Sequence, residues 1–243
     1  MLRTLKADLH IHTCLSPCGE LEMSPAAIAE QAKIKEIDII GICDHNSAEN
    51  VQAVIKAAQK FDISVLPGIE VTSQEEVHIL ALFDKVEEAF KLQEIIYDNL
   101  PGENDEETFG MQVVVNKHGE VLGFNKKLLI GASTLSVEEV IDIIHSLNGL
   151  AVASHIDREA FSIISQLGFI PDHLEFDALE ISPAISYREA HQKFKPACPL
   201  VSFSDAHFLR EIGQAVTLFY IEEGSINEIK KAFLNKDGRK IIQ

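Results

Sequence analysis

Cysteine is scarce in this sequence of 243 residues. The four cysteines, Cys14, Cys18, Cys43 and Cys198, are irregularly spaced along the chain. This spacing excludes the disulfide framework that stabilises many small secreted domains. We therefore expect any specific role of these thiols to be metal ligation or packing.

Long hydrophobic runs are also absent. The first residues, MLRTLKADLH, lack the apolar run of a signal peptide, and no later stretch approaches the ~18 apolar residues that a membrane span needs. These absences predict a cytoplasmic protein without membrane contact. Hydrophobic residues still make up 46% of the chain, which is enough for a sizeable buried core.

Positive charge is limited, because 21 Lys and Arg residues face 38 Asp and Glu residues and give a formal net charge of -17. This charge opposes long-range attraction to nucleic acid or to an anionic membrane. Bound divalent cations would reverse the field locally. The composition therefore favours small anionic substrates over nucleic acid as partners, and it leaves the oligomeric state unknown.

Short apolar runs rich in Ile, Val and Leu recur along the chain, and helical patterns separate most of them. They predict strands at 5–9, 38–42, 63–69, 77–82, 150–154, 177–181 and 200–203. The alternation predicts an α/β fold in which helices cover a parallel sheet. A closed or distorted barrel formed by one domain over residues 1–243 fits this length better than two domains.

Three segments carry helix signals. Ser24 followed by Pro25 predicts a helix start, and residues 47–60 supply the next helix. Ser136 and Glu139 have the spacing of a capping box.

Residues 84–125 interrupt the alternation. A helical pattern is followed by the acidic, breaker-rich segment PGENDEETFG, and VVVNKHGEVLGF then has the pattern of a β-hairpin. We interpret this region as an insertion or cap on the barrel.

Metal-ligating residue types lie at the ends of most predicted strands. His10 and His12 alternate after the first strand, so both imidazoles are expected to point the same way. The other strand termini carry Asp44, His45, Glu70, His78, His155, Asp205 and His207. Each residue alone could be a capping or core group, but active sites of such barrels are assembled from several strand ends. Their recurrence therefore predicts a metal site.

Six motifs at these positions resemble those of the PHP superfamily, named for polymerase and histidinol phosphatase. They are DLHIHT, CDHN, GIE, VHIL, SHIDRE and SDAH, and the resemblance covers most of the chain. It implies a distorted seven-stranded (β/α)7 TIM-like barrel and two or three divalent metals.

The resemblance also distributes the ligands. It implies one metal on His10, His12, Glu70 and Asp205, and a second on His78 and His155 with Glu70 as a bridge. A third metal would take His45, His207 and Cys18. At the position of Cys18, relatives commonly have His or Asp. A thiolate favours softer ions such as zinc or ferrous iron over magnesium. We expect the two or three divalent metals to be zinc, manganese or iron. The alternative is that Cys14 and Cys18 form a packed or oxidised pair.

Several neighbours have open roles. Asp8 and Asp44 could accept the second ring N–H of a metal-bound histidine or ligate a metal directly. Asp44, His207 or a metal-bound water could protonate the leaving group.

Arg158 occupies a position where relatives often place a phosphate contact, although it could equally be a solvated arginine. Lys126 and Lys127 are weaker candidates, and His118, His145, His173 and His191 are expected to be solvated or structural.

The reaction expected from this resemblance is hydrolysis of a small phosphate ester, such as a nucleotide or a histidinol phosphate, by a hydroxide that bridges the metals. The sequence contains no GxSxG, P-loop or dinucleotide glycine pattern. A nuclease acting on oligonucleotide ends is the second possibility, although no basic run supports it. A non-catalytic metal-stabilised module and a hydrolase of non-phosphate bonds with a lysine bridge are the remaining alternatives.

Overall fold

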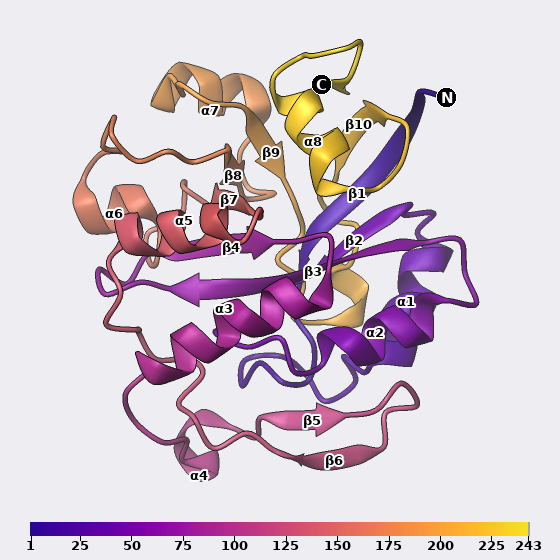
Figure 1. Ribbon diagram of the computed structural model, residues 1–243, viewed down its shortest axis with the longest axis vertical. Helices are drawn as coiled ribbons and strands as arrows, with labels where there is room; N and C mark the ends of the chain where they lie inside the picture. Colours follow the sequence, from indigo (N-terminus) through magenta and orange to yellow (C-terminus); the bar gives the residue numbers. More distant parts are fainter. Residues whose placement is uncertain (243) are drawn as a thin grey trace.

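The computed structural model describes residues 1–242, whose strands form a nine-stranded sheet and a separate two-stranded hairpin (Figure 1). The order in the large sheet is β11-β10-β1-β2-β3-β4-β7-β8-β9. The strands are β1 (Arg3–Ile11), β2 (Ile39–Ile42), β3 (Ser64–Thr72), β4 (His78–Leu82), β5 (Val113–Val115), β6 (Val121–Phe124), β7 (Leu150–Ala153), β8 (Ala178–Ile181), β9 (Leu200–Ser202), β10 (Thr217–Ile221) and β11 (Lys240–Ile242).

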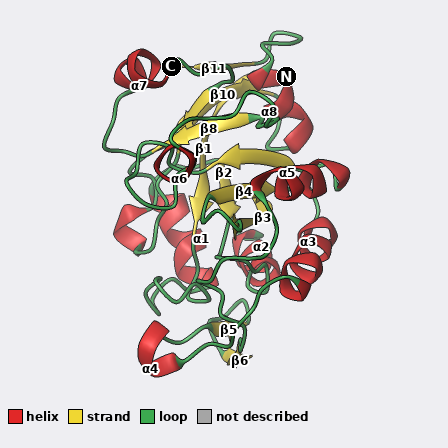
Figure 2. Ribbon diagram, turned by 90° about the vertical axis from the view of Figure 1, so that its left-hand side faces the viewer, coloured by secondary structure: helices red, strands yellow, loops and turns green. Residues whose placement is uncertain are grey.

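Helices flank this sheet (Figure 2). They are α1 (Pro25–Ile34), α2 (Val51–Ala58), α3 (Val86–Asp98), α4 (Glu106–Phe109), α5 (Val137–Ser146), α6 (Ile163–Leu167), α7 (Tyr187–Phe194) and α8 (Ile226–Phe233), with a 3-10 turn at Leu209–Glu211. Across residues 1–242, none of the helices combines the length and the apolar character needed to cross a membrane.

The large sheet curls into a distorted, partly closed barrel. The seven predicted strands correspond to β1, β2, β3, β4, β7, β8 and β9, whereas β10 and β11 were not predicted. Beyond β9 the chain returns to β1, where His12 N donates to Ala206 O at 3.0 Å and Ala206 N donates to His10 O at 3.2 Å. These bonds bring the first and last predicted strands together.

Among the seven predicted strands, the prediction of a parallel sheet was wrong at β4. This strand pairs antiparallel with both β3 and β7, and the unpredicted strand β10 pairs antiparallel with β1. A short connection of residues 73–77 joins β3 to β4, which is too short for the crossover that parallel pairing requires. Because β4 runs in the opposite direction, its first residue, His78, lies at the edge where neighbouring parallel strands end.

Two apolar layers hold the sheet in place. The inner layer contains alternate residues of β1, together with Leu66, Leu80 and Phe203, and α8 covers it with Ile229. The outer layer packs the other face of the sheet against the remaining large helices, for example through Ile144 of α5. Side chains alternate along each strand and so divide between the two layers. On β1 the inner layer ends at Leu9, and the polar residue His10 follows.

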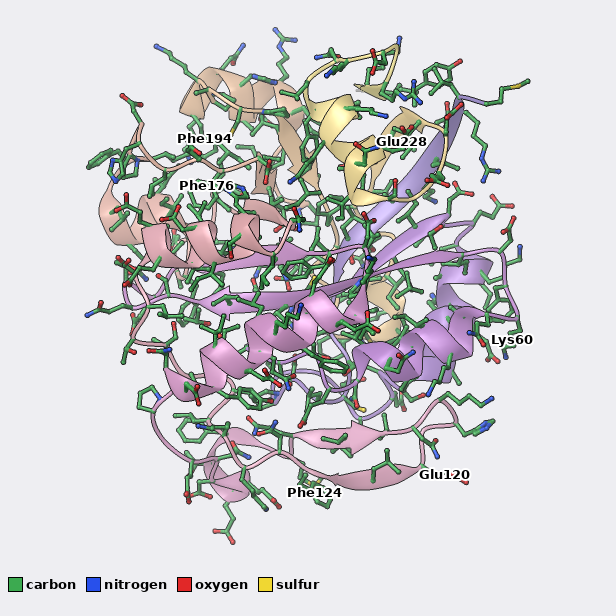
Figure 3. All side chains as sticks on the ribbon, in the orientation of Figure 1. Lys60, Glu120, Phe124, Phe176, Phe194 and Glu228 are labelled. Atoms are coloured by element: carbon green, nitrogen blue, oxygen red, sulfur yellow. The ribbon has the colours of Figure 1, made fainter. Side chains whose placement is uncertain are left out.

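The local helix and hairpin predictions are largely confirmed. Pro25 begins α1, and the Ser136–Glu139 capping box is formed at α5. The helix predicted at 47–60 begins later, at Val51, because residues 45–50 form a turn. The predicted insertion contains α3, α4 and the β5–β6 hairpin, on whose outer strand Phe124 lies near the lower edge of the molecule (Figure 3).

Gly41 is required by the close packing of β2 on β1. A Cβ atom at this position would lie 2.3 Å from the Leu9 carbonyl oxygen, which is backbone and cannot rotate away. We expect Gly41→Ala to lower the free energy of unfolding by about 3 kcal/mol, the upper range for overpacked sites. Urea unfolding measures this change. Gly123→Ala is the matched control, because its Cβ would meet nothing within 4 Å; equal losses in both variants would contradict this explanation.

Candidate metal centre

Six histidines and two carboxylates converge at the edge where β1, β2, β3, β7 and β9 end and where β4 begins. They are His10, His12, His45, Glu70, His78, His155, Asp205 and His207. All are buried except His207, whose side chain is 19% exposed. The structure thus brings together every predicted histidine and carboxylate ligand.

Glu70 lies at the centre of this cluster, and it is 1% exposed. Ring nitrogens of five histidines surround its carboxylate. Oε1 lies 3.3 Å from His10 Nε2, 3.0 Å from His78 Nδ1 and 3.4 Å from His155 Nε2, and Oε2 lies 3.4 Å from His12 Nε2 and 3.2 Å from His45 Nδ1. A carboxylate reached from opposite sides by imidazoles has the arrangement expected of a bridging ligand.

A bulge in β1 directs both of its histidines at this carboxylate. The pairing register between β1 and β2 shifts between Asp8 and Ile11. Leu9 packs in the inner layer, yet the next residue, His10, still reaches Glu70. A regular strand would send neighbouring side chains to opposite faces, whereas a bulge re-aims them.

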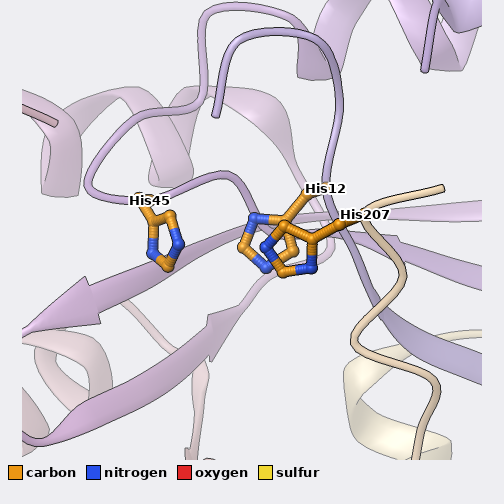
Figure 4. Close-up of side chains that lie close together, drawn as sticks. All are labelled: His12, His45 and His207. Atoms are coloured by element: carbon orange, nitrogen blue, oxygen red, sulfur yellow. The ribbon is translucent and has the colours of Figure 1, made fainter. Parts of the chain in front are cut away.

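Ligand atoms in three groups lie within 4.8 Å of one another. The first group contains His10, His12, Glu70 and Asp205; the second His45, Glu70 and His78; the third His12, His45 and His207. Figure 4 shows His207 over His12, with His45 to one side; the centroids of the first two rings are 4.1 Å apart. The first group equals the predicted set for one metal.

The other two groups differ from the predicted distribution. His45 is grouped with Glu70 and His78 as well as with His207, whereas His155 approaches Glu70 without joining a group. Among residues 1–242, no such group includes Cys18. The distribution of ligands over individual metals therefore stays a prediction.

The donor set fits divalent cations. Imidazole and carboxylate suit zinc, manganese and iron. Glu70 Oε1 and the Nδ1 atoms of His45 and His155 are buried without a hydrogen-bond partner. Unpaired buried polar atoms cost free energy unless a partner satisfies them, and a cation would satisfy the carboxylate oxygen and a coordinating nitrogen.

The pKa values of several ligands suit metal binding. Burial lowers the pKa of His45 well below its usual value, and burial together with the charge of His12 lowers that of His207 to about 4. Both rings are therefore neutral at pH 7 and keep a free lone pair. Burial raises the pKa of Glu70, but the neighbouring His78 and His10 outweigh it, so the carboxylate remains ionised.

Glu180 on β8 orients His10 and was missed in the sequence analysis. Its carboxylate oxygens lie 3.1 and 3.0 Å from His10 Nδ1. A proton on Nδ1 donated to Glu180 leaves Nε2 as the acceptor that faces Glu70. The sequence signal that could have found it is a single charged residue within the apolar segment ALEI. In the structure this residue is 1% exposed.

Removing the charge of Glu180 should weaken metal binding without removing a ligand. We expect Glu180→Gln to lower metal affinity about 10- to 100-fold, as is typical for partners behind a metal ligand. Competition with a chromogenic chelator measures the affinity. Glu228→Gln is the matched control, because this buried glutamate pairs with Arg239 on the far side of the inner layer. A smaller loss in Glu180→Gln than in the control would contradict the orienting role.

Asp44 acts on His12 through Ser16. The Ser16 hydroxyl lies 2.9 Å from His12 Nδ1 and donates to Asp44 Oδ1 at 2.7 Å. Thr13 N and Thr13 Oγ1 also donate to Asp44, each at 2.7 Å. Both carboxylate oxygens are thus occupied, and Asp44 does not line the cleft over the cluster. This geometry favours a positioning role over the predicted role as proton donor.

Asp8 does not accept a histidine N–H, contrary to one expectation. Its oxygens accept hydrogen bonds from Ser204 N, Ser204 Oγ and Gly213 N at 3.0, 2.6 and 2.8 Å. Burial raises its pKa to about 6. Asp8 therefore fixes the chain segment that carries Asp205 and His207.

A cleft of about 210 Å³ lies above the cluster. Arg158 and Cys18 line it together with His207. The Arg158 guanidinium forms an ion pair with Asp205 Oδ2, so it contacts one carboxylate of the cluster directly. Loss of solvent around the thiol and the charges of Glu70 and Asp205 raise the pKa of Cys18 to about 12.

The predicted pair of Cys14 and Cys18 is not oxidised, because both are free thiols, and Cys14 packs with Val113 and Val115. The remaining candidates lie away from the centre. Lys126 pairs with Glu106, and Lys127 donates to the Tyr97 carbonyl. His145 contacts Asp177 at 3.0 Å, and none of His118, His145, His173 and His191 lines the cleft.

Comparison with protein families gives two adjacent matches. Residues 8–166 match the model described as PHP domain, and residues 197–236 match one described as PHP-associated. A 5'-3' exoribonuclease of Haemophilus influenzae is 24% identical over 192 residues, which are 63% of this chain and 69% of that protein.

Solved structures share the fold. The lesion-specific endonuclease Q of Pyrococcus furiosus superimposes with a TM-score of 0.69 at 20% identity over 98% of this chain. The alignment spans only 58% of the endonuclease. A candidate metal-dependent phosphoesterase of Bifidobacterium adolescentis superimposes with a TM-score of 0.55 at 16% identity, covering 83% of this chain and 87% of that one.

Proposed function

Because the chain belongs to the PHP domain family of metal-dependent phosphoesterases, we propose that its buried His/Glu/Asp centre hydrolyses a small phosphate ester. The observation that carries this proposal is Glu70, a buried carboxylate with five imidazole nitrogens within 3.4 Å. That arrangement supports two or more divalent ions held close together. Arg158 lines the cleft above it, pairs with Asp205 and is 42% exposed, so it offers a cation to an incoming phosphate.

Each part of the centre has a distinct task in this proposal. Bound divalent ions would supply Lewis acidity and an activated water for phosphoryl displacement. Glu70 and Asp205 provide the negative charge that holds the ions. Glu180 and the Ser16–Asp44 pair fix the tautomers of His10 and His12, so that Nε2 of each ring faces the centre.

We assign His207 to metal binding and not to proton delivery. Its side chain is 19% exposed, the largest value among the eight clustered histidines and carboxylates, and it lines the cleft. Its Nδ1 lies 2.9 Å from the Asp205 carbonyl oxygen, so Nε2 is directed away from that contact. The pKa of about 4 means that His207 is neutral at pH 7, so its Nε2 lone pair is free for a cation and holds no proton for the leaving group.

A second candidate substrate is the end of a nucleic acid. The exoribonuclease relative and the endonuclease Q fold favour it. The cleft of about 210 Å³ is small for a ligand site, which supports a terminal phosphoester over one inside a duplex. The net charge of -17 favours the small ester.

A paired screen tests the proposed reaction. Protein loaded with manganese or zinc would be incubated with a phosphomonoester panel and, separately, with 5'-phosphorylated oligonucleotides. Release of phosphate from small esters supports the first candidate, and shortening of oligonucleotides alone supports the second. Asp205→Asn is the control, because it removes a ligand; activity that persists in this variant, or none with either substrate class, would contradict the proposal.

Cys18 remains our candidate donor for a third metal. It lines the cleft with His45 and His207, and a bound soft cation would lower its raised thiol pKa. We expect Cys18→Ser to lower zinc content by about one ion per chain, measured by elemental analysis. Cys198→Ser is the control for loss of a thiol elsewhere. Unchanged stoichiometry would remove Cys18 from the site.

A further inference from the structure

Two exposed apolar side chains line the cleft beside the clustered histidines and carboxylates. Phe161 is 40% exposed and Ile130 is 37% exposed, and both line the cleft. The two residues come from different parts of the chain, Phe161 from the segment before α6 and Ile130 from the segment before α5. Exposed apolar residues are ordinary when scattered singly, but a pair facing the same catalytic opening requires an explanation.

Phe161 is held in an unfavourable backbone conformation. Its φ angle is +57°, a left-handed value that is rare for a bulky residue. The surrounding contacts enforce it: the Phe161 carbonyl accepts a hydrogen bond from His78 N at 2.9 Å, and Ser162 caps the following helix. Such strain persists where neighbouring structure over-determines it, and it is concentrated at ligand sites.

The segment that carries Phe161 also carries His155 and Arg158. Asp157 ties it to the end of β8, because Ser182 N and Ser182 Oγ donate to its carboxylate at 2.7 and 2.6 Å. A metal-ligand candidate, a cation and an aromatic ring are therefore fixed within one short, doubly anchored segment. Their relative positions cannot change independently.

One face of the Phe161 ring is already occupied. It stacks on His78 with 4.7 Å between ring centroids and 15° between the planes. The exposed part of the ring borders the cleft, where Arg158 is 42% exposed. A rigid ring beside a cation and above a phosphate-binding centre provides a stacking surface for a planar group attached to the phosphate.

We propose that Phe161 is a specificity-determining residue that stacks against a planar aromatic group of the substrate, so that the site selects phosphoesters bearing a ring such as a nucleobase. This inference rests on the proposed function and deepens it. The cleft accommodates the phosphate and adjacent sugar, and the ring lies at its mouth between Phe161 and Ile130. An aliphatic phosphate ester would leave this apolar surface in water.

The test uses two substrates that differ only in the base. Adenosine 5'-monophosphate and ribose 5-phosphate present the same phosphomonoester of ribose, with and without a nucleobase. For longer substrates, an oligonucleotide that lacks its 5'-terminal base is compared with the intact oligonucleotide. We expect the native protein to favour the base-bearing member by about tenfold in kcat/KM, a factor within the range of aromatic–base stacking. Phe161→Leu should reduce this preference to about onefold, whereas Phe161→Trp should keep it.

Binding provides a readout that does not depend on turnover. Calorimetric titration of metal-loaded protein should give the same base preference in Kd, reduced in Phe161→Leu. Phe169→Leu is the matched control, because Phe169 is 64% exposed and does not line the cleft. Metal content and Tm establish that each variant is folded and loaded.

The outcomes separate this inference from the proposed function. Equal losses for both substrates in Phe161→Leu would mean that the ring only supports His78, and the inference would be overturned while hydrolysis stands. A base preference in binding without hydrolysis of any ester would overturn the proposed function and support the stacking site. Absence of a base preference in the native protein, in turnover and in binding, would also overturn the inference.

Discussion

Replacing Glu70 by glutamine is expected to lower kcat/KM for any phosphoester that the protein hydrolyses by more than ~100-fold. Loss of a residue that only orients a metal ligand typically costs about 10- to 100-fold, and Glu70 approaches the ring nitrogens of five histidines directly. Glutamine has the same shape but lacks the charge that balances two cations. Metal content and steady-state kinetics, measured on the same preparation, give the result.

The matched control is Glu120→Gln, the same chemical change on the exposed hairpin at the lower edge of the molecule (Figure 3). It should change neither metal content nor kcat/KM. Native turnover in Glu70→Gln, or an equal loss in the control, would show that the bridging role is wrong.

Removal of the metals is expected to lower Tm by about 5–10 °C. Ions present at about 100 times their Kd stabilise the folded state by about 2.7 kcal/mol, and each kcal/mol shifts Tm by about 2–4 °C in a chain of this size. Without cations, Glu70 Oε1 and the Nδ1 atoms of His45 and His155 remain buried and unpaired. Thermal melts with a chelator and with excess manganese measure the difference.

The difference in Tm should also grow with pH. Burial lowers the pKa of His12, but Asp205 and Glu70 outweigh it and raise the pKa from 6.5 to about 9 in the metal-free chain. A group whose folded pKa is raised stabilises the fold fully below its unfolded pKa, and this contribution is lost as the pH rises through the folded pKa. The proton therefore stabilises the metal-free chain at pH 6.5 and no longer does so above about pH 9.

Cations that replace this proton should stabilise the protein more strongly at pH 9 than at pH 6.5. His12→Asn should reduce the pH dependence of the metal effect. His118→Asn, at an exposed turn position outside the centre, should leave it unchanged. Identical melting of chelated and loaded protein at both pH values would contradict metal binding by this cluster.

The fold could be predicted wherever a local pattern decides the structure. Seven strands were found because buried strands are continuous apolar runs, and the Ser136–Glu139 capping box marks a helix start by itself. The direction of β4 could not be predicted, because it depends on a short turn at residues 73–77 that the alternation of strands does not reveal. β10 was not predicted, although in the structure its residues alternate between buried and half-buried positions. β11 was not predicted either, and it has only three residues.

The histidines and carboxylates that the sequence predicts as ligands lie together in the structure, whereas Glu180 and Ser16, which contact two of these histidines, were not predicted. His10, Glu70 and Asp205 stand at strand ends, where motif and position coincide. Glu180 and Ser16 act through contacts with residues 170 and 4 positions away. The predicted role of Asp8 failed because a bulge in β1 breaks the alternation that would have placed it beside His10.

The most direct test of the central claim is anomalous diffraction from crystals of the manganese-loaded protein, recorded on both sides of the manganese absorption edge. We expect at least two peaks within coordination distance of Glu70, one of them also within coordination distance of His10, His12 and Asp205. Peaks confined to other parts of the surface, with clear density for a Glu70 side chain that contacts only histidines, would contradict it.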